Sequence, residues 1–264
     1  MRIKPEFFDR FSCKASACRH TCCAGWEICI DDETAGRYET LLTDDERQKL
    51  GKMPDRLLCR EGERCVFLRP DRLCGLIISH GEGALCEICR EHPRFYSYSE
   101  DGGICEAGVG LCCEEGARLW LGTDPVFICE DDGFEASDDE AAALRTQQKL
   151  IKRALSGEFP TLDYAGLTNV YRRLETLEPL DFPEEPPVIP PLNAGRLAAY
   201  YIYRWYFEYP DAAEYFAAAN AIMTSALGGD FADSARKLSC EAEYDPDNTE
   251  LIIDYLRTLK AAGH

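Results

Sequence analysis

The sequence lacks any apolar run long enough to cross a membrane, since a helical span needs about 18 to 20 residues. Its most apolar stretch, LAAYYIYRWYF, is shorter and contains Arg204. The first residues, MRIKPEFFDRF, carry charges and are not followed by the continuous apolar segment of an export signal. These absences predict a cytoplasmic protein that does not associate with a membrane.

Positive charge is also scarce. The chain has 264 residues, with 29 Lys and Arg against 48 Asp and Glu, and its formal net charge is −19. A field of this sign repels phosphate backbones and anionic lipid surfaces, so we do not expect nucleic acid as a partner. The acidity serves solubility first, and it also favours a basic partner such as a lysine-bearing protein segment.

Several sequence signatures of catalysis are missing. No G-x-G-x-x-G follows an expected strand, so the glycine-rich dinucleotide motif is absent. The C-x3-C-x2-C spacing of radical enzymes is absent as well. A hydrolase triad and a metalloprotease helix find no support among the four histidines, which are His20, His80, His92 and His264. The sequence therefore directs attention to cysteine.

Cysteine is abundant, with fifteen residues, fourteen of them between Cys13 and Cys129. The cytosol keeps thiols reduced, so metal binding or catalysis explains this density better than disulfides do. The opening set has the spacing C-x4-C-x3-CC, and closely spaced cysteines supply several ligands to one ion at little ordering cost. Disulfides and simple packing are the alternatives for this set. His20 lies within it and is a candidate replacement for a thiolate on zinc.

The fold is expected to be mainly α-helical and to have two parts. Residues 1–135 are rich in Cys, Gly and turn residues, and we expect an irregular, cysteine-rich, metal-organised module with only short helices. Thr43 and Glu46 have the spacing of a capping box and predict the start of one such helix. The short apolar runs VFL and LIIS do not discriminate between strand and helix.

Residues 136–264 are expected to form an α-helical bundle. Ser137 and Glu140 have the spacing of a second capping box, followed by apolar residues at helical spacing. The segment 181–191, DFPEEPPVIPP, contains five prolines and predicts an extended connector. The LAAYYIYRWYF segment after it is apolar nearly all round, which indicates a buried helix.

Several segments carry a resemblance to a known family. They are CKASACRHTCCAGWEICID, CVFL with LCGL, CREHPR and LCCEEGARL. Together they resemble the flagellin lysine-N-methylase family, which is related to the wider group of zinc- or iron-chelating cysteine-cluster proteins. LAAYYIYRWYF and CEAEYDPDNTELI look like that family's C-terminal segments, so the resemblance covers most of the chain. The chain departs from the family at Glu114, where proline is usual, and at Gly116, where alanine is usual.

The resemblance implies transfer of a methyl group from S-adenosylmethionine to lysine side chains of a protein such as flagellin. It also implies an iron–sulfur cluster, of the 4Fe–4S type, bound by cysteines, with zinc as the alternative ion. Carried onto this chain, the recurring family cysteines are Cys13, Cys18, Cys22, Cys23, Cys65, Cys74, Cys89 and Cys113. The other seven look like extras where the family more often has small or apolar residues: Cys29, Cys59, Cys86, Cys105, Cys112, Cys129 and Cys240.

Methyl transfer sets a chemical requirement on the site. A lysine amine attacks a sulfonium methyl group only when neutral, although its ordinary pKa is about 10.4. Groups that could take its proton near the cysteine motifs are Asp31, Tyr96 and Glu115. Side chains that could hold the cofactor are an aromatic ring for the adenine and two guanidinium groups for the carboxylate, namely Trp26, Arg94 and Arg118. Each of these side chains also has a structural interpretation, as a cap, an ion-pair partner or a core residue.

Three hypotheses about function follow. The first is a metal-cluster-containing protein-lysine N-methyltransferase. The second is a non-catalytic zinc-binding module that serves as a structural or interaction domain. The third is an iron–sulfur redox protein. All three require a bound metal, so the metal alone does not separate them.

Overall fold

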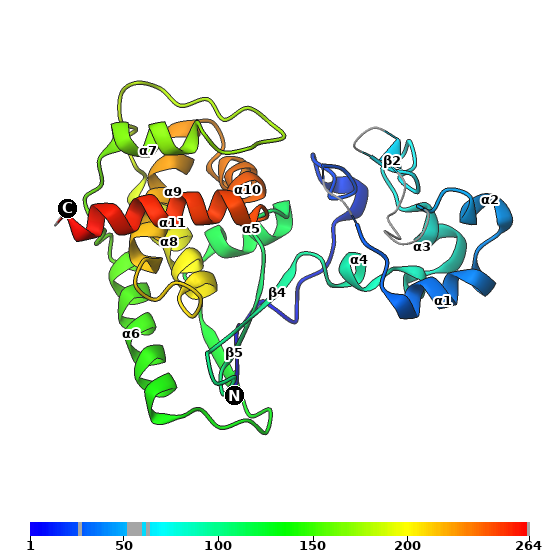
Figure 1. Ribbon diagram of the computed structural model, residues 1–264, viewed down its shortest axis with the longest axis horizontal. Helices are drawn as coiled ribbons and strands as arrows, with labels where there is room; N and C mark the ends of the chain where they lie inside the picture. Colours follow the sequence, from blue (N-terminus) through cyan, green and yellow to red (C-terminus); the bar gives the residue numbers. More distant parts are fainter. Residues whose placement is uncertain (26–27, 52–59, 62–63, 263–264) are drawn as a thin grey trace. The chain divides into compact units, whose positions relative to one another are not determined.

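The computed structural model describes residues 1–25, 28–51, 60–61 and 64–262. The chain divides into two compact units (Figure 1). One comprises Met1–Ser12 and Pro93–His264, and we call it the helical unit. The other comprises Cys13–His92, and we call it the cysteine-rich unit because it contains ten of the fifteen cysteines. Helices predominate among the described elements, so the prediction of a mainly α fold is confirmed.

A four-stranded sheet lies in the helical unit. Its strands are β1 (Arg2–Pro5), β4 (Arg94–Tyr98), β5 (Cys105–Val109) and β6 (Phe127–Glu130), in the order β4-β5-β1-β6. β1 runs parallel to β5 and antiparallel to β6, and β4 runs antiparallel to β5. The first strand of the chain is therefore an inner strand that pairs with segments far along the sequence.

This pairing places the division of the chain elsewhere than the predicted boundary at residue 135. Residues 93–135 supply three strands and α5 (Glu114–Gly122), and all four elements belong to the helical unit. The predicted boundary followed the distribution of cysteines. Pairing between strands distant in sequence leaves no local signal of that kind, because each strand alone is only four or five residues long.

Six helices follow β6 among the described residues. They are α6 (Asp138–Leu155), α7 (Tyr164–Tyr171), α8 (Pro191–Trp205), α9 (Ala213–Leu227), α10 (Phe231–Ala242) and α11 (Pro246–Ala261). The segment from 181 to 190 contains no helix or strand, as its prolines predict, and Pro191 begins α8. None of the described helices is both long and apolar enough to span a membrane.

Helix α8 lies at the centre of the helical unit, where it contacts α6 and α9 (Figure 1). Its residues Leu197 to Tyr203 are at most 1% exposed, as the apolar pattern predicts. The Tyr203 hydroxyl lies 2.7 Å from the backbone oxygen of Ile3 and 3.0 Å from that of Ala107, and its one proton is shared between these two acceptors. Trp120 of α5 packs edge-on against Tyr200 with ring centroids 5.2 Å apart. These contacts join the bundle to the sheet in one core.

The cysteine-rich unit has short elements around a smaller core. In chain order they are η1 (Ala15–Ala17), α1 (Asp32–Leu41), α2 (Asp44–Arg47), β2 (Arg60–Glu61), β3 (Arg64–Cys65), α3 (Gly75–His80), η2 (Glu82–Ala84) and α4 (Glu87–Glu91). The LIIS run is part of α3. The buried side chains form one apolar cluster of Ile28, Ile30, Tyr38, Leu42, Phe67, Leu76, Ala84 and Cys86.

Both predicted capping boxes are confirmed. The Thr43 hydroxyl accepts a hydrogen bond from the backbone N–H of Glu46, and the Glu46 carboxylate accepts one from the backbone N–H of Thr43. Ser137 and Glu140 make the same reciprocal pair at the start of α6. The local side-chain chemistry thus fixes the start of a helix in each unit.

Gly116 provides a test of the packing beneath α5. A Cβ atom at this position would lie 2.3 Å from the backbone oxygen of Gly110 and 3.1 Å from Cγ1 of Val109. We expect Gly116→Ala to lower the free energy of unfolding of the helical unit by about 1–3 kcal/mol. Urea unfolding followed by circular dichroism measures this loss.

The matched control is Gly122→Ala in the same helix, where a Cβ atom would meet nothing within 4 Å. We expect Gly122→Ala to leave the free energy of unfolding unchanged or to raise it slightly. Equal stabilities for Gly116→Ala and the wild type would show that the close approach of α5 to Gly110 is not as described.

Candidate functional site

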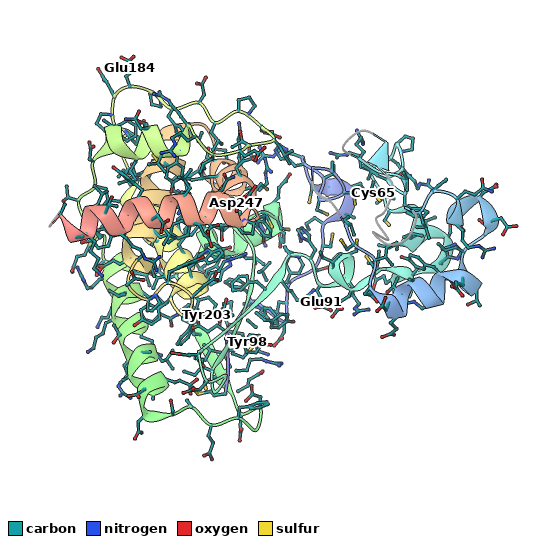
Figure 2. All side chains as sticks on the ribbon, in the orientation of Figure 1. Cys65, Glu91, Tyr98, Glu184, Tyr203 and Asp247 are labelled. Carbon is teal, nitrogen blue, oxygen red and sulfur yellow. The ribbon has the colours of Figure 1, made fainter. Side chains whose placement is uncertain are left out.

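Thiols gather around the apolar cluster of the cysteine-rich unit. Cys86 belongs to the cluster and is 1% exposed, and Cys65, Cys74 and Cys89 pack against it half-buried. Figure 2 shows sulfur atoms, in yellow, in this unit near the labelled Cys65. The four residues come from two segments, 65–74 and 86–89. The fold therefore brings together thiols that are distant in sequence.

Backbone hydrogen bonds add the opening set of cysteines to this region. The Cys65 N–H donates to the backbone oxygen of Cys23 at 2.8 Å, and Ala24 forms an isolated bridge with Arg64. The Arg72 guanidinium donates to the backbone oxygens of Ser16 (2.6 Å) and Arg19 (3.2 Å). The segment containing the first cysteines is thus held to the loop between Cys65 and Cys74.

That loop is closed by its own backbone. The Leu68 N–H donates to the oxygen of Cys65 at 2.9 Å, and the Gly75 N–H donates to the oxygen of Phe67 at 2.8 Å. Leu68 also forms an isolated bridge with Cys74, which is the N-cap residue of α3. Folding of this local turn is what brings Cys65 and Cys74 to the same cluster.

The thiols influence one another's ionisation. Burial raises the pKa of Cys65 and of Cys74, and the neighbouring Cys23 raises each further. A hydrogen bond with Cys22 lowers the pKa of Cys23 to about 7, and a hydrogen bond with Cys89 lowers the pKa of Cys86 to about 7. Thiols that interact in this way can supply thiolates, the form that binds a metal.

The cysteine side chains of this group are chemically suited to bind a metal through their thiolates. Cys23, Cys65, Cys74, Cys86 and Cys89 are thiols rather than disulfides, and soft sulfur donors select zinc and iron–sulfur clusters. Within the described ranges, no group of three or more His, Cys, Asp or Glu side chains already has the arrangement of ligands around an ion. Metal binding would therefore draw thiols that are already neighbours closer to one point.

The other predicted ligands lie in different surroundings. Cys13 and Cys22 are exposed and Cys18 is half-buried, all in the first segment of the cysteine-rich unit. Cys113 belongs to the helical unit, where it is the N-cap residue of α5. Cys86, which the resemblance treats as an extra, is instead central to the thiol group. The C-x2-C spacing of Cys86 and Cys89 was its only signal in the sequence.

The candidate cofactor-binding side chains are engaged with their own unit where the structure describes them. The Arg94 guanidinium lies 5.8 Å from the ring centroid of Phe8 and 5.3 Å from that of Phe11. Arg118 donates two hydrogen bonds to the Glu115 carboxylate, at 2.7 and 2.6 Å. Trp26 lies outside the described residues.

Asp31 has a structural role. Its carboxylate is the N-cap of α1, where it accepts from the Thr34 N–H at 2.8 Å, and it also accepts from the Glu87 N–H of α4 at 2.9 Å. These backbone hydrogen bonds lower its pKa to about 2. Such a weak base is unsuited to taking a proton from lysine at neutral pH. Tyr96, another candidate base, is 41% exposed and lies edge-on to Phe8.

The Asp31 cap should make the stability of the cysteine-rich unit depend on pH. Since the folded-state pKa is about 2 and the ordinary value is 3.8, the contribution is present above pH 3.8 and is lost as the pH falls towards 2. We expect Asp31→Ala to cost about 1 kcal/mol at neutral pH. Urea unfolding of variant and wild type at several pH values should show this difference shrinking on acidification. Glu39→Ala, an exposed change in the same helix, should show no such trend.

A buried ion pair is the main polar feature of the helical unit that the sequence did not reveal. The Arg204 Nε lies 3.1 Å from Oε2 of Glu243, and their side chains are 10% and 0% exposed. The same carboxylate oxygen accepts from the Tyr200 hydroxyl and the Trp205 indole N–H, each at 3.0 Å. The Tyr244 hydroxyl receives hydrogen bonds from the Cys112 thiol and the Arg204 guanidinium. This network holds the end of α8 against the segment after α10.

The fold and the site describe a mainly helical protein with a thiol-rich unit, and the comparisons with known proteins give its family. A lysine-N-methylase of Salmonella typhimurium is 29% identical over 163 residues, and one of Salmonella choleraesuis is 28% identical over 163 residues. The flagellar biosynthetic protein FliU of Salmonella muenchen is 32% identical over 146 residues, which cover 50% of this chain and 83% of FliU. The chain therefore belongs to the flagellin lysine-N-methylase family.

The matches to the two lysine-N-methylases cover only part of each chain. Each lysine-N-methylase alignment covers 56% of this chain, and the chain spans only 39% of the length of those two relatives. No family model matches the sequence. No solved structure matches it either.

Proposed function

We propose that the chain takes part, in the cytoplasm, in the N-methylation of protein lysine side chains, with S-adenosylmethionine as the methyl donor. The observation that carries this proposal is the sequence similarity to two proteins named lysine-N-methylase. The candidates for binding the cofactor are Trp26, Arg94 and Arg118, of which Arg118 has a 64% exposed side chain. We assign no catalytic base.

The proposed methyl acceptor is a protein with exposed lysines, of which flagellin is the leading candidate. The relative named flagellar biosynthetic protein FliU supports a connection with flagella. The formal charge of −19 supports an attractive field for a lysine-bearing segment, and a field of this kind acts mainly on the rate of association.

The proposed metal centre lies in the cysteine-rich unit. Of the eight predicted ligands, Cys23, Cys65, Cys74 and Cys89 influence one another's pKa values, and Cys22 influences that of Cys23. A 4Fe–4S cluster is the first candidate and zinc is the second. When bound, the cluster would supply a redox-active centre, whereas zinc would only fix the ligands in place.

A second candidate function is a non-catalytic zinc-binding module. The small core in the described part of the cysteine-rich unit favours it, because the described residues there bury one apolar cluster of eight members and a structural ion would add to its stability. In that case the helical unit would serve as an interaction surface. An iron–sulfur redox protein has no further observation in its favour.

Binding of S-adenosylmethionine separates these functions. The full chain is purified without oxygen, its iron, sulfide and zinc contents are measured, and the cofactor is titrated into it in a calorimeter. We expect stoichiometric metal and saturable heat of binding. Stoichiometric zinc without cofactor binding would favour the structural module. A chain fully loaded with either the iron–sulfur cluster or zinc that does not bind the cofactor would overturn the methyltransferase proposal.

A further inference from the structure

Cys86 occupies a position in the thiol group that its sequence context does not suggest. The family resemblance does not assign a metal ligand at this position. The side chain is 1% exposed, and it is a member of the apolar cluster against which Cys65, Cys74 and Cys89 pack. Simple packing as a small apolar residue is the first explanation for a buried cysteine, and it predicts apolar neighbours only.

Thiols lie around the cluster that contains Cys86, because Cys65, Cys74 and Cys89 all pack against it. Cys89 follows Cys86 by one helical turn, and each of the two thiols shifts the pKa of the other. The α4 backbone fixes this pair, since Cys86 is the N-cap residue and its oxygen accepts from the Arg90 N–H at 2.9 Å. Two sulfur atoms that each lie 2.3 Å from a tetrahedral ion are about 3.8 Å apart. Two cysteines one helical turn apart can bring their sulfur atoms to this separation on one ion.

A second pair of thiols, from the segment 65–74, packs against the same apolar cluster. Cys65 and Cys74 are brought there by the closed turn in which Leu68 pairs with Cys74. Two hydrogen-bonded turns therefore each bring two thiols to the cluster, and four thiolates are the usual complement of a structural zinc ion or a 4Fe–4S cluster. Cys23 lies beside this group through its backbone bond to Cys65, and its thiol interacts with that of Cys22 as well.

We propose that Cys86 is a metal ligand, which completes a four-thiolate set with Cys65, Cys74 and Cys89. This inference rests on the metal centre of the proposed function and not on methyl transfer. It locates a complete set of ligands within the cysteine-rich unit, so that neither Cys113 of the helical unit nor the exposed Cys13 and Cys22 are needed for this centre.

Cobalt(II) binding to the reduced, metal-free full chain tests the assignment, because the sulfur-to-cobalt charge-transfer band reports the thiolates on the ion. We expect Cys86→Ser to weaken Co²⁺ binding by about 100-fold or more, since loss of a supporting contact alone costs 10–100-fold. At saturation the band should fall by roughly one quarter. Cys29→Ser, an exposed cysteine of the same unit, is the matched control and should bind as the wild type does.

A Cys86→Ser chain with the affinity and band of the wild type would overturn the inference and leave the metal centre standing. A wild-type chain that binds no Co²⁺ would overturn the metal centre itself, and this inference with it. If Cys86→Ser fails to fold, the wild-type chain loaded with an NMR-active cadmium isotope decides the question. A scalar coupling between cadmium and the β-protons of Cys86 requires a cadmium–sulfur bond, and its absence, with couplings present to Cys65, Cys74 and Cys89, would show that Cys86 only packs.

Discussion

Removal of the metal is expected to unfold the cysteine-rich unit while the helical unit stays folded. The described residues of the cysteine-rich unit bury one apolar cluster of eight members, whereas the helical unit has a large continuous core centred on α8. Small units with little buried apolar surface need additional cross-links to stay folded. When the metal is removed, its thiolate ligands either take up protons or repel one another, so nothing holds them together. Hydrogen exchange followed by mass spectrometry, with and without a chelator under reducing conditions, reports each unit separately.

The expected result is complete loss of protection in the described residues of 13–92, with unchanged protection in α8. Re-addition of the metal should restore the protection. Cys129→Ser, an exposed change in the helical unit, serves as a control that leaves the metal-dependent difference intact. Equal protection of the cysteine-rich unit in the presence and absence of metal would mean that its small apolar cluster is sufficient, and that the thiols have another purpose.

Glu243→Gln is expected to lower the free energy of unfolding of the helical unit by about 3–5 kcal/mol, because it leaves the buried Arg204 charge without its counter-ion. Glutamine has nearly the same shape as glutamate, so little of this cost would come from packing. The Tyr200 hydroxyl and the Trp205 indole would keep an acceptor in the new amide. Urea unfolding followed by circular dichroism measures the effect.

The matched control is Asp211→Asn, which removes the same charge from an exposed ion pair. Arg257 and Asp211 lie 2.9 Å apart, with side chains 44% and 52% exposed, so their pair should contribute at most about 1 kcal/mol. If Glu243→Gln costs no more than Asp211→Asn, then water reaches Arg204 in the folded chain and the pair is not buried as described.

The parts of the fold that the sequence predicts are those with a local cause. Ser137 and Glu140 mark the start of α6 because each side chain bonds the other's backbone three residues away. The even spread of apolar residues along LAAYYIYRWYF predicts the burial of α8. The position of β1 between β5 and β6 has no such cause, since it depends on partners about a hundred residues later. The two units could not be delimited without it.

The same distinction applies to the candidate site. The resemblance singles out Cys65, Cys74 and Cys89 through their motifs, and the structure brings these three to one apolar cluster. Cys86 carries only a weak motif signal, because a C-x2-C spacing is common by chance in a cysteine-rich chain. The Arg204–Glu243 pair is hidden for a different reason: a charged residue in an apolar run gives no indication of which distant carboxylate meets it.

The proposed methylation of protein lysine residues can be measured as an increase in the mass of an acceptor protein. Fully metallated chain is incubated without oxygen with flagellin and S-adenosylmethionine carrying an isotopically labelled methyl group, and the peptides are examined by mass spectrometry. We expect labelled methyl groups on lysine side chains, and none when the cofactor is omitted. A folded, metallated chain that binds the cofactor but leaves every flagellin lysine unlabelled would rule out flagellin methylation by this chain.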